Sequence, residues 1–387
     1  MSLFSGRILI GTSGWDYDDW VGPFYRDEKH KLAQYCRVFP TTEINSTFYS
    51  LPTPSLSRGL ARATPRGFVF SAKLYKGITH EKKLNPKLGV DVLLREYFSA
   101  IEPLKKSGKL GPILIQMPPR PRKDFPYFED FLSLLPENFK YAVEFRDHSW
   151  LDDGVFRLLE RYGVAYVIVD EPLLPPIIKV TSDIAYIRWH GRGARPWYYY
   201  QYREEELREW VPRVREVAER VNTLYGYFNN HFRGYAPRNA LQMLRLLGIA
   251  SKTQLRVLEQ IDNWFRVGEA LKRRETALKK LSESASLKDI LSAFTTKGRL
   301  ERGVQIPDDQ VDVEYRGPII TGRIKDYSFT IDTANRVIRH NCADWEKTKE
   351  TKMLCKHMVK VFLSIPAQRS REILEDLARN MELWVFE

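Results

Sequence analysis

The stretch that decides the fold is Val143-Glu-Phe-Arg-Asp-His-Ser-Trp150. A short apolar run, Tyr141–Val143, leads directly into a glutamate, an arginine and a histidine, and a tryptophan closes the turn. Parallel α/β proteins often carry their functional side chains directly after a strand, because the strand is rigid and its carboxyl end opens on a cleft. The pattern therefore predicts a parallel α/β fold with functional groups at the ends of its strands.

Other β-rich runs along the chain end in a similar manner. They are Arg7–Ile10, Thr42–Asn45, Phe68–Phe70, Ile113–Ile115, Ala165–Val169, Ala185–Trp189 and Leu224–Phe228. Helical patterns lie between most of them. Eight strand–helix units in about 250 residues are the expectation for a TIM-type (β/α)8 barrel, here residues 1–250. An open doubly wound sheet is disfavoured, because the chain has neither a GxGxxG fingerprint nor a Walker loop.

Composition limits the classes of partner. The 387 residues are 43% hydrophobic and carry 61 basic and 49 acidic side chains, a net charge of +12. The excess is spread over the chain, +8 before residue 251 and +4 after it. A basic balance favours nucleic acid as the commonest anionic partner, although acidic substrates also fit. Without a long apolar run or a disulfide framework, we expect a cytoplasmic protein with no membrane partner.

The rest of the chain has a different pattern. Residues 251–305 form a charged helical stretch and predict a linker, in which Ser286-Leu-Lys-Asp289 is a capping box that opens a further helix. Strand-like runs follow at Val311–Tyr315, Ile319–Ile324, Tyr327–Ile331 and Arg336–Arg339. Residues 306–387 are therefore predicted to form a small ββα zinc-finger domain.

Two pairs of possible zinc ligands follow these strands. His340 and Cys342 form the first pair, Cys355 and His357 form the second, and a spacer separates them. Zinc accepts mixed thiolate and imidazole ligands in a closed tetrahedral site, so the pattern predicts structural Zn2+ that supports folding. Alternatively, the cysteines are ordinary buried thiols and the histidines lie on the surface. Asp344 is the alternative to His340 as the fourth ligand.

This segment resembles the SWIM zinc finger, whose pattern is Cys-x-Cys, a spacer and Cys-x-His, with Asp and an aromatic residue after the second Cys. Asp344-Trp345 supplies the trailing pair, and His340 stands where the first Cys is usual. The resemblance implies binding to DNA, RNA or a protein partner, and we weakly favour DNA over RNA. The nearby lysines fit either a phosphate-facing surface or a solvated charged face: Lys347, Lys349, Lys352, Lys356 and Lys360.

The predicted strand ends gather candidate functional groups. The candidates for catalysis are Glu43, Lys73, Glu144 and Asp170, since clustered carboxylates can serve as acid and base. Arginine can hold a phosphate, amides can orient hydroxyls or bases, and aromatic rings can stack on a base or a sugar. The candidates for substrate or anion binding are Trp15, Asn45, Tyr49, Gln116, Arg146, Trp150, Arg188, His190, Asn229, Asn230 and His231. The alternative is an ion-pair layer that closes the barrel, and the interleaved cations argue against a catalytic metal cluster.

Four motifs resemble the YecE-like family, a TIM-barrel domain of unknown function. They are Gly11-Thr-Ser-Gly-Trp-x-Tyr17, Glu43-Ile-Asn-Ser-Thr-Phe-Tyr49, Glu144-Phe-Arg-x-x-Ser-Trp150 and Tyr227-Phe-Asn-Asn-His-x-Arg-Gly-Tyr-Ala236. The resemblance implies the barrel but not an activity, because a fold alone does not assign a function.

These patterns together predict a nucleic-acid-associated TIM-barrel enzyme. It would be a hydrolase or lyase of the nuclease or glycosylase class, targeted by the zinc-binding module. One alternative is a non-catalytic adaptor that binds nucleic acid or protein. Another is a sugar-phosphate enzyme whose SWIM-like module mediates assembly.

Overall fold

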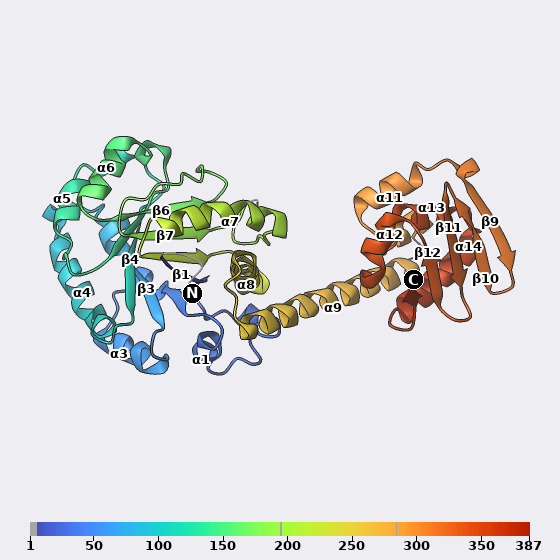
Figure 1. The fold of residues 1–387 in the computed structure, drawn as a ribbon, viewed down its shortest axis with the longest axis horizontal. Coiled ribbons are helices and arrows are strands. Elements are labelled where there is room, and N and C mark those ends of the chain that lie inside the picture. Colours follow the sequence, from blue (N-terminus) through green and yellow to red (C-terminus); the bar gives the residue numbers. More distant parts are fainter. Residues whose placement is uncertain (1–5, 194–195, 284) are drawn as a thin grey trace. The chain divides into compact units, whose positions relative to one another are not determined.

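A computed structural model describes residues 6–193, 196–283 and 285–387 (Figure 1). The chain divides into two compact units, Met1–Asp262 and Asn263–Glu387. Helix α9, Lys252–Ser282, begins in the first unit and ends in the second. The first unit therefore extends past residue 250, and the helices predicted for the linker belong to the core of the second unit. No helix in the described part of the chain is both long and apolar enough to cross a membrane.

The first unit is a closed barrel of parallel strands with β8 paired to β1. The strands are β1 Arg7–Ser13, β2 Thr41–Ile44, β3 Val69–Lys73, β4 Leu110–Gln116, β5 Tyr141–Glu144, β6 Ala165–Asp170, β7 Ile184–Trp189 and β8 Thr223–Phe228. Every predicted strand is present in the predicted order. The prediction of a TIM-type (β/α)8 barrel is therefore confirmed.

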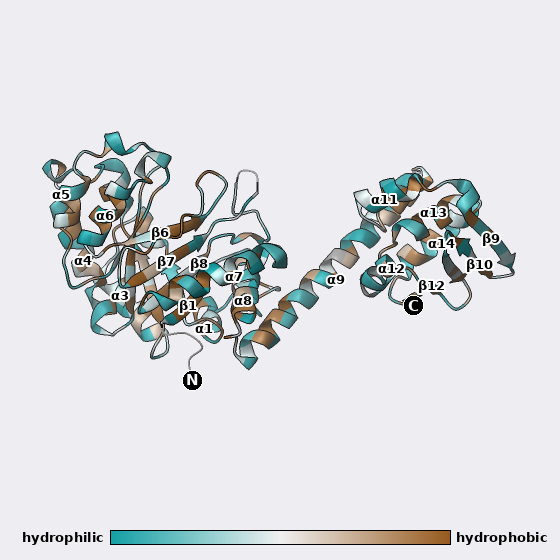
Figure 2. Cartoon of the chain, turned by 45° about the horizontal axis from the view of Figure 1, so that its top comes forward, coloured by the Kyte–Doolittle hydropathy of each residue, from teal (hydrophilic) through white to brown (hydrophobic). Residues whose placement is uncertain are grey.

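Helices lie outside the barrel (Figure 1). The main ones are α1 Lys31–Cys36, α3 Pro54–Ala63, α4 Val90–Lys106, α5 Phe128–Ser133, α6 Asp153–Arg161, α7 Glu204–Glu219 and α8 Tyr235–Leu247. In Figure 2 the barrel strands are mainly hydrophobic, whereas the helices carry both hydrophobic and hydrophilic residues. This is expected when one face of each helix packs on the sheet. The sequence patterns did not predict α3, although Thr53 caps it by accepting from the Leu56 N–H at 3.2 Å.

Alternation along the strands decides which side chains reach the mouth of the barrel, because successive residues point to opposite faces. The barrel interior contains Val169 of β6, Tyr186 of β7 and Tyr227 of β8. The residues two positions after these, on the same face, are Glu171 after Val169, Arg188 after Tyr186 and Asn229 after Tyr227. The barrel therefore delivers these three side chains to its open carboxyl end.

The second unit is built on a five-stranded sheet in the order β13-β12-β11-β10-β9. Its strands are β9 Val311–Arg316, β10 Ile319–Ile324, β11 Tyr327–Asp332, β12 Val337–His340 and β13 Val385–Phe386, and β13 alone runs parallel to its neighbour. Its helices are α10 Leu287–Leu291, α11 Lys297–Val304, α12 Ala343–Thr348, α13 Lys356–Ser364 and α14 Ala367–Arg379. The unit is thus larger than the predicted ββα finger. The predicted cap at Ser286 is present, with its hydroxyl accepting from the Asp289 N–H at 3.2 Å.

The size of the second unit follows from its core. Trp345, Phe362 and Trp384 are fully enclosed together with Phe294 of the segment that was predicted to be a linker. A ββα finger has too few residues to bury this much apolar surface, and the extra helices and β13 supply it.

Candidate active site and metal centre

Arg188, at the end of β7, cross-links the strands around the barrel mouth. Its Nε lies 3.2 Å from Glu43 Oε2, and its Nη1 lies 2.6 Å from Glu144 Oε2. The Ser13 hydroxyl donates to the same Glu43 oxygen. Burial opposes the charge on Arg188, but Glu144 and Glu43 outweigh it and raise the pKa of the guanidinium. The ion pairs therefore fix both carboxylates in place across three strands.

Arg146 forms a second layer nearer to solvent. Its Nη2 contacts Glu144 Oε1, and its Nη1 lies 2.8 Å from Glu171 Oε2. The Arg146 side chain is 15% exposed, whereas that of Glu171 is 1% exposed. Arg146 thus connects the inner ion-pair cluster to the solvent-facing side of the mouth.

The two glutamates that Arg146 holds differ in their protonation. Burial opposes the charge on Glu144, but Arg146 and Arg188 reverse this effect and hold the pKa of Glu144 well below its usual range. Burial raises the pKa of Glu171 to about 7, because Arg146 offsets only part of the desolvation and Glu144 adds repulsion. The mouth therefore contains a permanent carboxylate beside a carboxyl group that is close to half-protonated at neutral pH.

His190 is a neutral side chain in this cluster. Burial and the positive charge of Arg146 lower the pKa of His190 to about 3. The Asn229 amide lies 2.9 Å from His190 Nδ1, and His190 Nε2 lies 3.3 Å from Glu144 Oε1. His190 Nε2 also lies 3.3 Å from Arg146 Nη2, so the neutral ring contacts both the arginine and the carboxylate of the cluster.

Lys73 reaches the mouth from the end of β3. The residue is 8% exposed, and its Nζ lies 4.1 Å from the centre of the Phe48 ring. Burial and the charge of Arg188 lower the pKa of Lys73 to about 7, in spite of Glu144 and Glu43. About half of this amine is therefore uncharged at neutral pH.

A cavity of about 720 Å³ opens beside these groups. Its polar lining consists of Gln116, Arg146, Glu171, His190 and Asn229. Its remaining lining includes Leu173 and the aromatic residues Trp197 and Tyr198. The volume and the mixture of apolar walls with a few convergent polar groups are typical of a small-molecule site. A second hollow of about 230 Å³ is lined by Trp15, Tyr17 and Asn45.

Three of the predicted site residues lie outside the mouth. Asp170 accepts from Trp210 Nε1 at 2.6 Å on helix α7, and Asn230 donates to Asn239 Oδ1 at 2.8 Å on helix α8. Trp150 is fully buried and stacks on Phe145 with ring centres 4.7 Å apart. These side chains join the strands to the helical layer and have packing roles in this structure.

The remaining predicted aromatic groups lie at the rim. His231 is stacked between Tyr17 and Tyr198, with ring centres 4.5 Å apart on both sides. Tyr49 is 68% exposed on the short helix α2, Ser46–Tyr49, and meets Phe48 edge-on. The ring of Tyr49 is therefore accessible to solvent, and that of Tyr198 faces the cavity.

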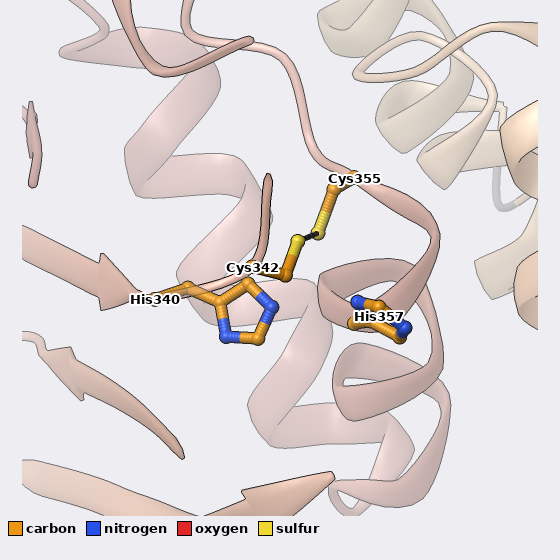
Figure 3. Close-up of side chains that lie close together, drawn as sticks. All are labelled: His340, Cys342, Cys355 and His357. Carbon is orange, nitrogen blue, oxygen red and sulfur yellow. Dashed lines mark hydrogen bonds between the residues drawn. The ribbon is translucent and has the colours of Figure 1, made fainter. Parts of the chain in front are cut away.

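The second unit contains a compact group of possible metal ligands (Figure 3). His340 ends β12, Cys342 caps α12, Cys355 caps α13, and His357 lies in the first turn of α13. The four side chains are buried, and their ligand atoms all lie within 4.8 Å of one another. The structure thus brings together the four residues predicted to bind zinc.

The geometry of this group fits a tetrahedral zinc site. The sulfur atoms of Cys342 and Cys355 are 3.7 Å apart, close to the ~3.8 Å separation of two thiolates on tetrahedral zinc and far from the ~2.05 Å of a disulfide. Among the described residues, His340 Nε2 and His357 Nδ1 are buried and have no hydrogen-bond partner, as atoms reserved for a metal would be. His340 Nδ1 lies 2.8 Å from the Ser328 carbonyl, which fixes the ring with Nε2 facing the other ligands.

Asp344 does not take part in this group. Both of its carboxylate oxygens pair with Arg299, at 2.9 and 3.0 Å, so the carboxylate is engaged elsewhere. His340 therefore fits the fourth position better than Asp344. The four ligands would hold a structural zinc that joins β12 to the starts of two helices.

Three of the five lysines beside the ligands make contacts within their own unit. Lys360 is buried and contacts Asp308, and Lys352 donates to the Met381 carbonyl at 2.7 Å. Lys349 pairs with Glu346 at 2.7 Å. The sequence spacing alone could not reveal these contacts.

Comparison with known proteins agrees with the barrel. A family described as "Protein of unknown function DUF72" matches residues 9–263. This chain belongs to the DUF72 family. The match covers the barrel strands and ends before the ligand group in the second unit.

Individual relatives cover the same part of the DUF72 chain. The UPF0759 protein YunF of Bacillus subtilis is 26% identical over an alignment of 268 residues, and the match covers 62% of this chain and 95% of that protein. The UPF0759 protein YecE of Escherichia coli is 31% identical over 170 residues, 42% of this chain and 59% of that protein. Among solved structures, a DUF72 family protein from Thermotoga maritima is 32% identical, with a TM-score of 0.55, covering 62% of this chain and 99% of that one. A DUF72 family protein from Enterococcus faecalis, 22% identical with a TM-score of 0.56, shows the shared fold alone.

Several residues of the DUF72 mouth were not predicted from the sequence. Glu171 lies directly after the acidic residue that was chosen, and Ser13 lies at the end of β1. Alternation could have found Glu171, because it shares a face with Val167 and Val169, whereas Asp170 does not. The aromatic wall at residues 197–198 gives no such signal, because it comes from a long loop.

Proposed function

We propose that this DUF72 chain is an enzyme whose reaction takes place in the barrel mouth, on a nucleic acid or a nucleotide-like anion. The observation that carries the proposal is the pairing of Arg146 and Glu171 on the wall of a 720 Å³ cavity. Arginine supplies a planar donor for a phosphate, and the glutamate supplies a transferable proton. The reaction would be a hydrolysis or an elimination, both of which need a proton donor or acceptor.

Glu171 supports this role better than Glu43 or Glu144. Those two carboxylates are clamped by Arg188, and the low pKa of Glu144 leaves it without a proton to give. The pKa of Glu171, about 7, lies where both protonation states are populated, which is the condition for efficient acid–base catalysis. Glu144 would act as a positioning residue for Arg146 and His190.

Anion binding and proton transfer are coupled through Arg146. A phosphate that bound to Nη1 of Arg146 would compete with Glu171 Oε2 for the same donor. Loss of this hydrogen bond would leave the Glu171 carboxylate buried without its main partner, so its pKa would rise further. Binding of the anion would thus prepare Glu171 as a general acid.

The other walls of the cavity fit the remainder of a nucleotide. Trp197 and Tyr198 offer aromatic surface for a base or a sugar, and Gln116 and Asn229 offer amides for hydroxyl or ring atoms. The net charge of +12 favours the approach of such a polyanion.

The second unit would deliver this substrate. Its His–Cys–Cys–His group supports a zinc-stabilised module, and the SWIM-like pattern suggests that the module binds nucleic acid. Because Lys349, Lys352 and Lys360 are engaged within the unit, contacts from its other faces would be needed besides electrostatic attraction.

The test uses the full-length protein with labelled single-stranded DNA, double-stranded DNA and RNA. Wild type, Glu171→Gln and the exposed control Glu137→Gln are compared for binding at several salt concentrations and for product formation. We expect Glu171→Gln to lose at least about 100-fold in turnover with unchanged binding, and Glu137→Gln to match wild type. Equal turnover in all three proteins would refute the acid–base role, and binding without any product would favour the adaptor alternative.

A further inference from the structure

Lys73 differs from the other cations of the mouth in its surroundings. Arg146 and Arg188 each bind carboxylates, whereas among the described residues the Nζ of Lys73 has neither an ion pair nor a hydrogen bond with a side chain or backbone. The Nζ of Lys73 lies 4.1 Å from the centre of the Phe48 ring. The Lys73 carbonyl accepts from Thr47 Oγ1 at 2.6 Å and from the Tyr97 hydroxyl at 3.1 Å. These bonds fix the backbone at the end of β3, from which the Lys73 side chain extends.

This environment makes Lys73 a potential nucleophile. An amine attacks a carbonyl only in its uncharged form, and enzymes obtain that form by desolvation or by placing another cation nearby. Both factors are present here, because burial and the Arg188 charge lower the pKa of Lys73 to about 7. The carboxylates of Glu43 and Glu144 are unsuitable as nucleophiles, because Arg188 binds both.

We propose that Lys73 forms an imine with the aldehyde or ketone group of an anionic substrate. The proposal rests on the proposed function, since Arg146 would hold the phosphate of the same substrate. In a nucleic acid the matching group is the open-chain aldehyde of an abasic deoxyribose. The site would then be a lyase site rather than a hydrolase site.

The chemistry balances without an oxidant, a reductant or a second substrate. The nitrogen lone pair forms a bond to the aldehyde carbon, and loss of water from the resulting carbinolamine gives the protonated imine. Glu171, protonated when the phosphate is bound, gives its proton to the departing hydroxyl of the carbinolamine. The resulting Glu171 carboxylate then removes a proton from the adjacent carbon while the imine accepts the electron pair. The bond from the β-carbon to the phosphate oxygen then breaks, and the phosphate leaves with that pair. Water hydrolyses the imine, which releases the unsaturated aldehyde and regenerates the amine.

The experiment traps the imine by reduction on the full-length protein. The two probes are an oligonucleotide with one abasic site and glyceraldehyde 3-phosphate, each incubated with sodium cyanoborohydride. We expect a covalent adduct in the intact mass spectrum, mapped to Lys73 by peptide mass spectrometry. Its rate of formation should rise between about pH 6 and pH 8, with a midpoint near the pKa of Lys73, about 7.

Variants separate a chemical role from a structural one. Lys73→Arg keeps a cation and should lose the adduct while retaining binding of the probe. The matched control is Lys76→Met, because Lys76 is a nearby lysine with a 40% exposed side chain, and this variant should react like wild type. Mapping on wild type does not depend on the folding of any variant.

The outcomes distinguish this inference from the proposed function. No adduct at Lys73 with either probe, or adducts spread over exposed lysines, would overturn the imine proposal. If turnover of nucleic acid still depended on Glu171 in that case, the acid–base site would stand without amine chemistry. An adduct at Lys73 with no dependence of turnover on Glu171 would support the amine and remove the proton-transfer role of that glutamate.

Discussion

Replacement of Arg188 by methionine tests whether the ion pairs of the mouth organise the barrel. The substitution keeps most of the side-chain volume but leaves Glu43 and Glu144 buried without their shared cation. Two charge-assisted hydrogen bonds, at 3.2 and 2.6 Å, are lost. Each is worth about 1.5–3 kcal/mol, and breaking a buried ion pair by removal of one partner costs about 3–5 kcal/mol. We therefore expect the barrel unit to lose about 4 kcal/mol of unfolding free energy near neutral pH.

The loss should depend on pH in a defined direction. In wild type the pKa of Glu144 is depressed, so this group adds stability that is present above its unfolded pKa and is lost as the pH falls. The variant lacks much of that contribution, so the difference between the two proteins should be larger at about pH 8 than at about pH 4. Urea denaturation followed by hydrogen exchange of peptides from β5 and β7 measures the barrel separately from the second unit. The exposed Arg208→Met, which removes a surface pair with Glu204, should cost less than about 1 kcal/mol. A loss for Arg188→Met as small as this control, or a loss that grows as the pH falls, would refute the reasoning.

Further predictions separate structural roles from chemical ones. Asp170→Asn should lower the melting temperature, because it weakens the hydrogen bond from Trp210. The pH dependence of turnover should stay unchanged, and a shifted pH profile would place Asp170 in the reaction. Glu171→Gln should be more stable than wild type at about pH 8 by roughly 1–3 kcal/mol. The reason is that Glu171 has a raised pKa in the folded protein, so wild type loses stability as the pH rises through that pKa. Calorimetry of both proteins at about pH 5.5 and pH 8 tests this, and a variant no more stable than wild type at either pH contradicts it. Metal analysis should find about one zinc per chain in wild type and in Asp344→Ala, and much less in His340→Ala; full zinc in His340→Ala would return Asp344 to the ligand set.

The barrel was predictable because its physical signals are local. Short β-rich runs, each followed by a helical pattern, recur often enough to require a closed parallel sheet. The second unit was predicted less well because its core is not local. Phe294 from the predicted linker and Trp384 from the chain end pack together with Trp345, and no sequence spacing indicates this.

The candidate site could be predicted as a location but not as a set of contacts. Glu144, Arg146, Arg188, His190 and Asn229 meet in the mouth, as their positions at strand ends suggested. Asp170 and Glu171 are adjacent in sequence, and only the direction of side chains along β6 distinguishes them. Trp150 was predicted to stack on a ligand, but the structure buries it, since an aromatic residue at a strand end serves a core as readily as a site.

The central claim is that anion binding at Arg146 controls the proton on Glu171. Carbon-13 NMR of glutamate-labelled protein, with Glu171→Gln used to assign the signal, measures this proton directly. We predict a pKa for Glu171 of about 7 in the free protein and a higher value when a nucleoside monophosphate is bound. A pKa for Glu171 in the usual carboxyl range of about 4 to 5, unchanged by the nucleotide, would contradict the account.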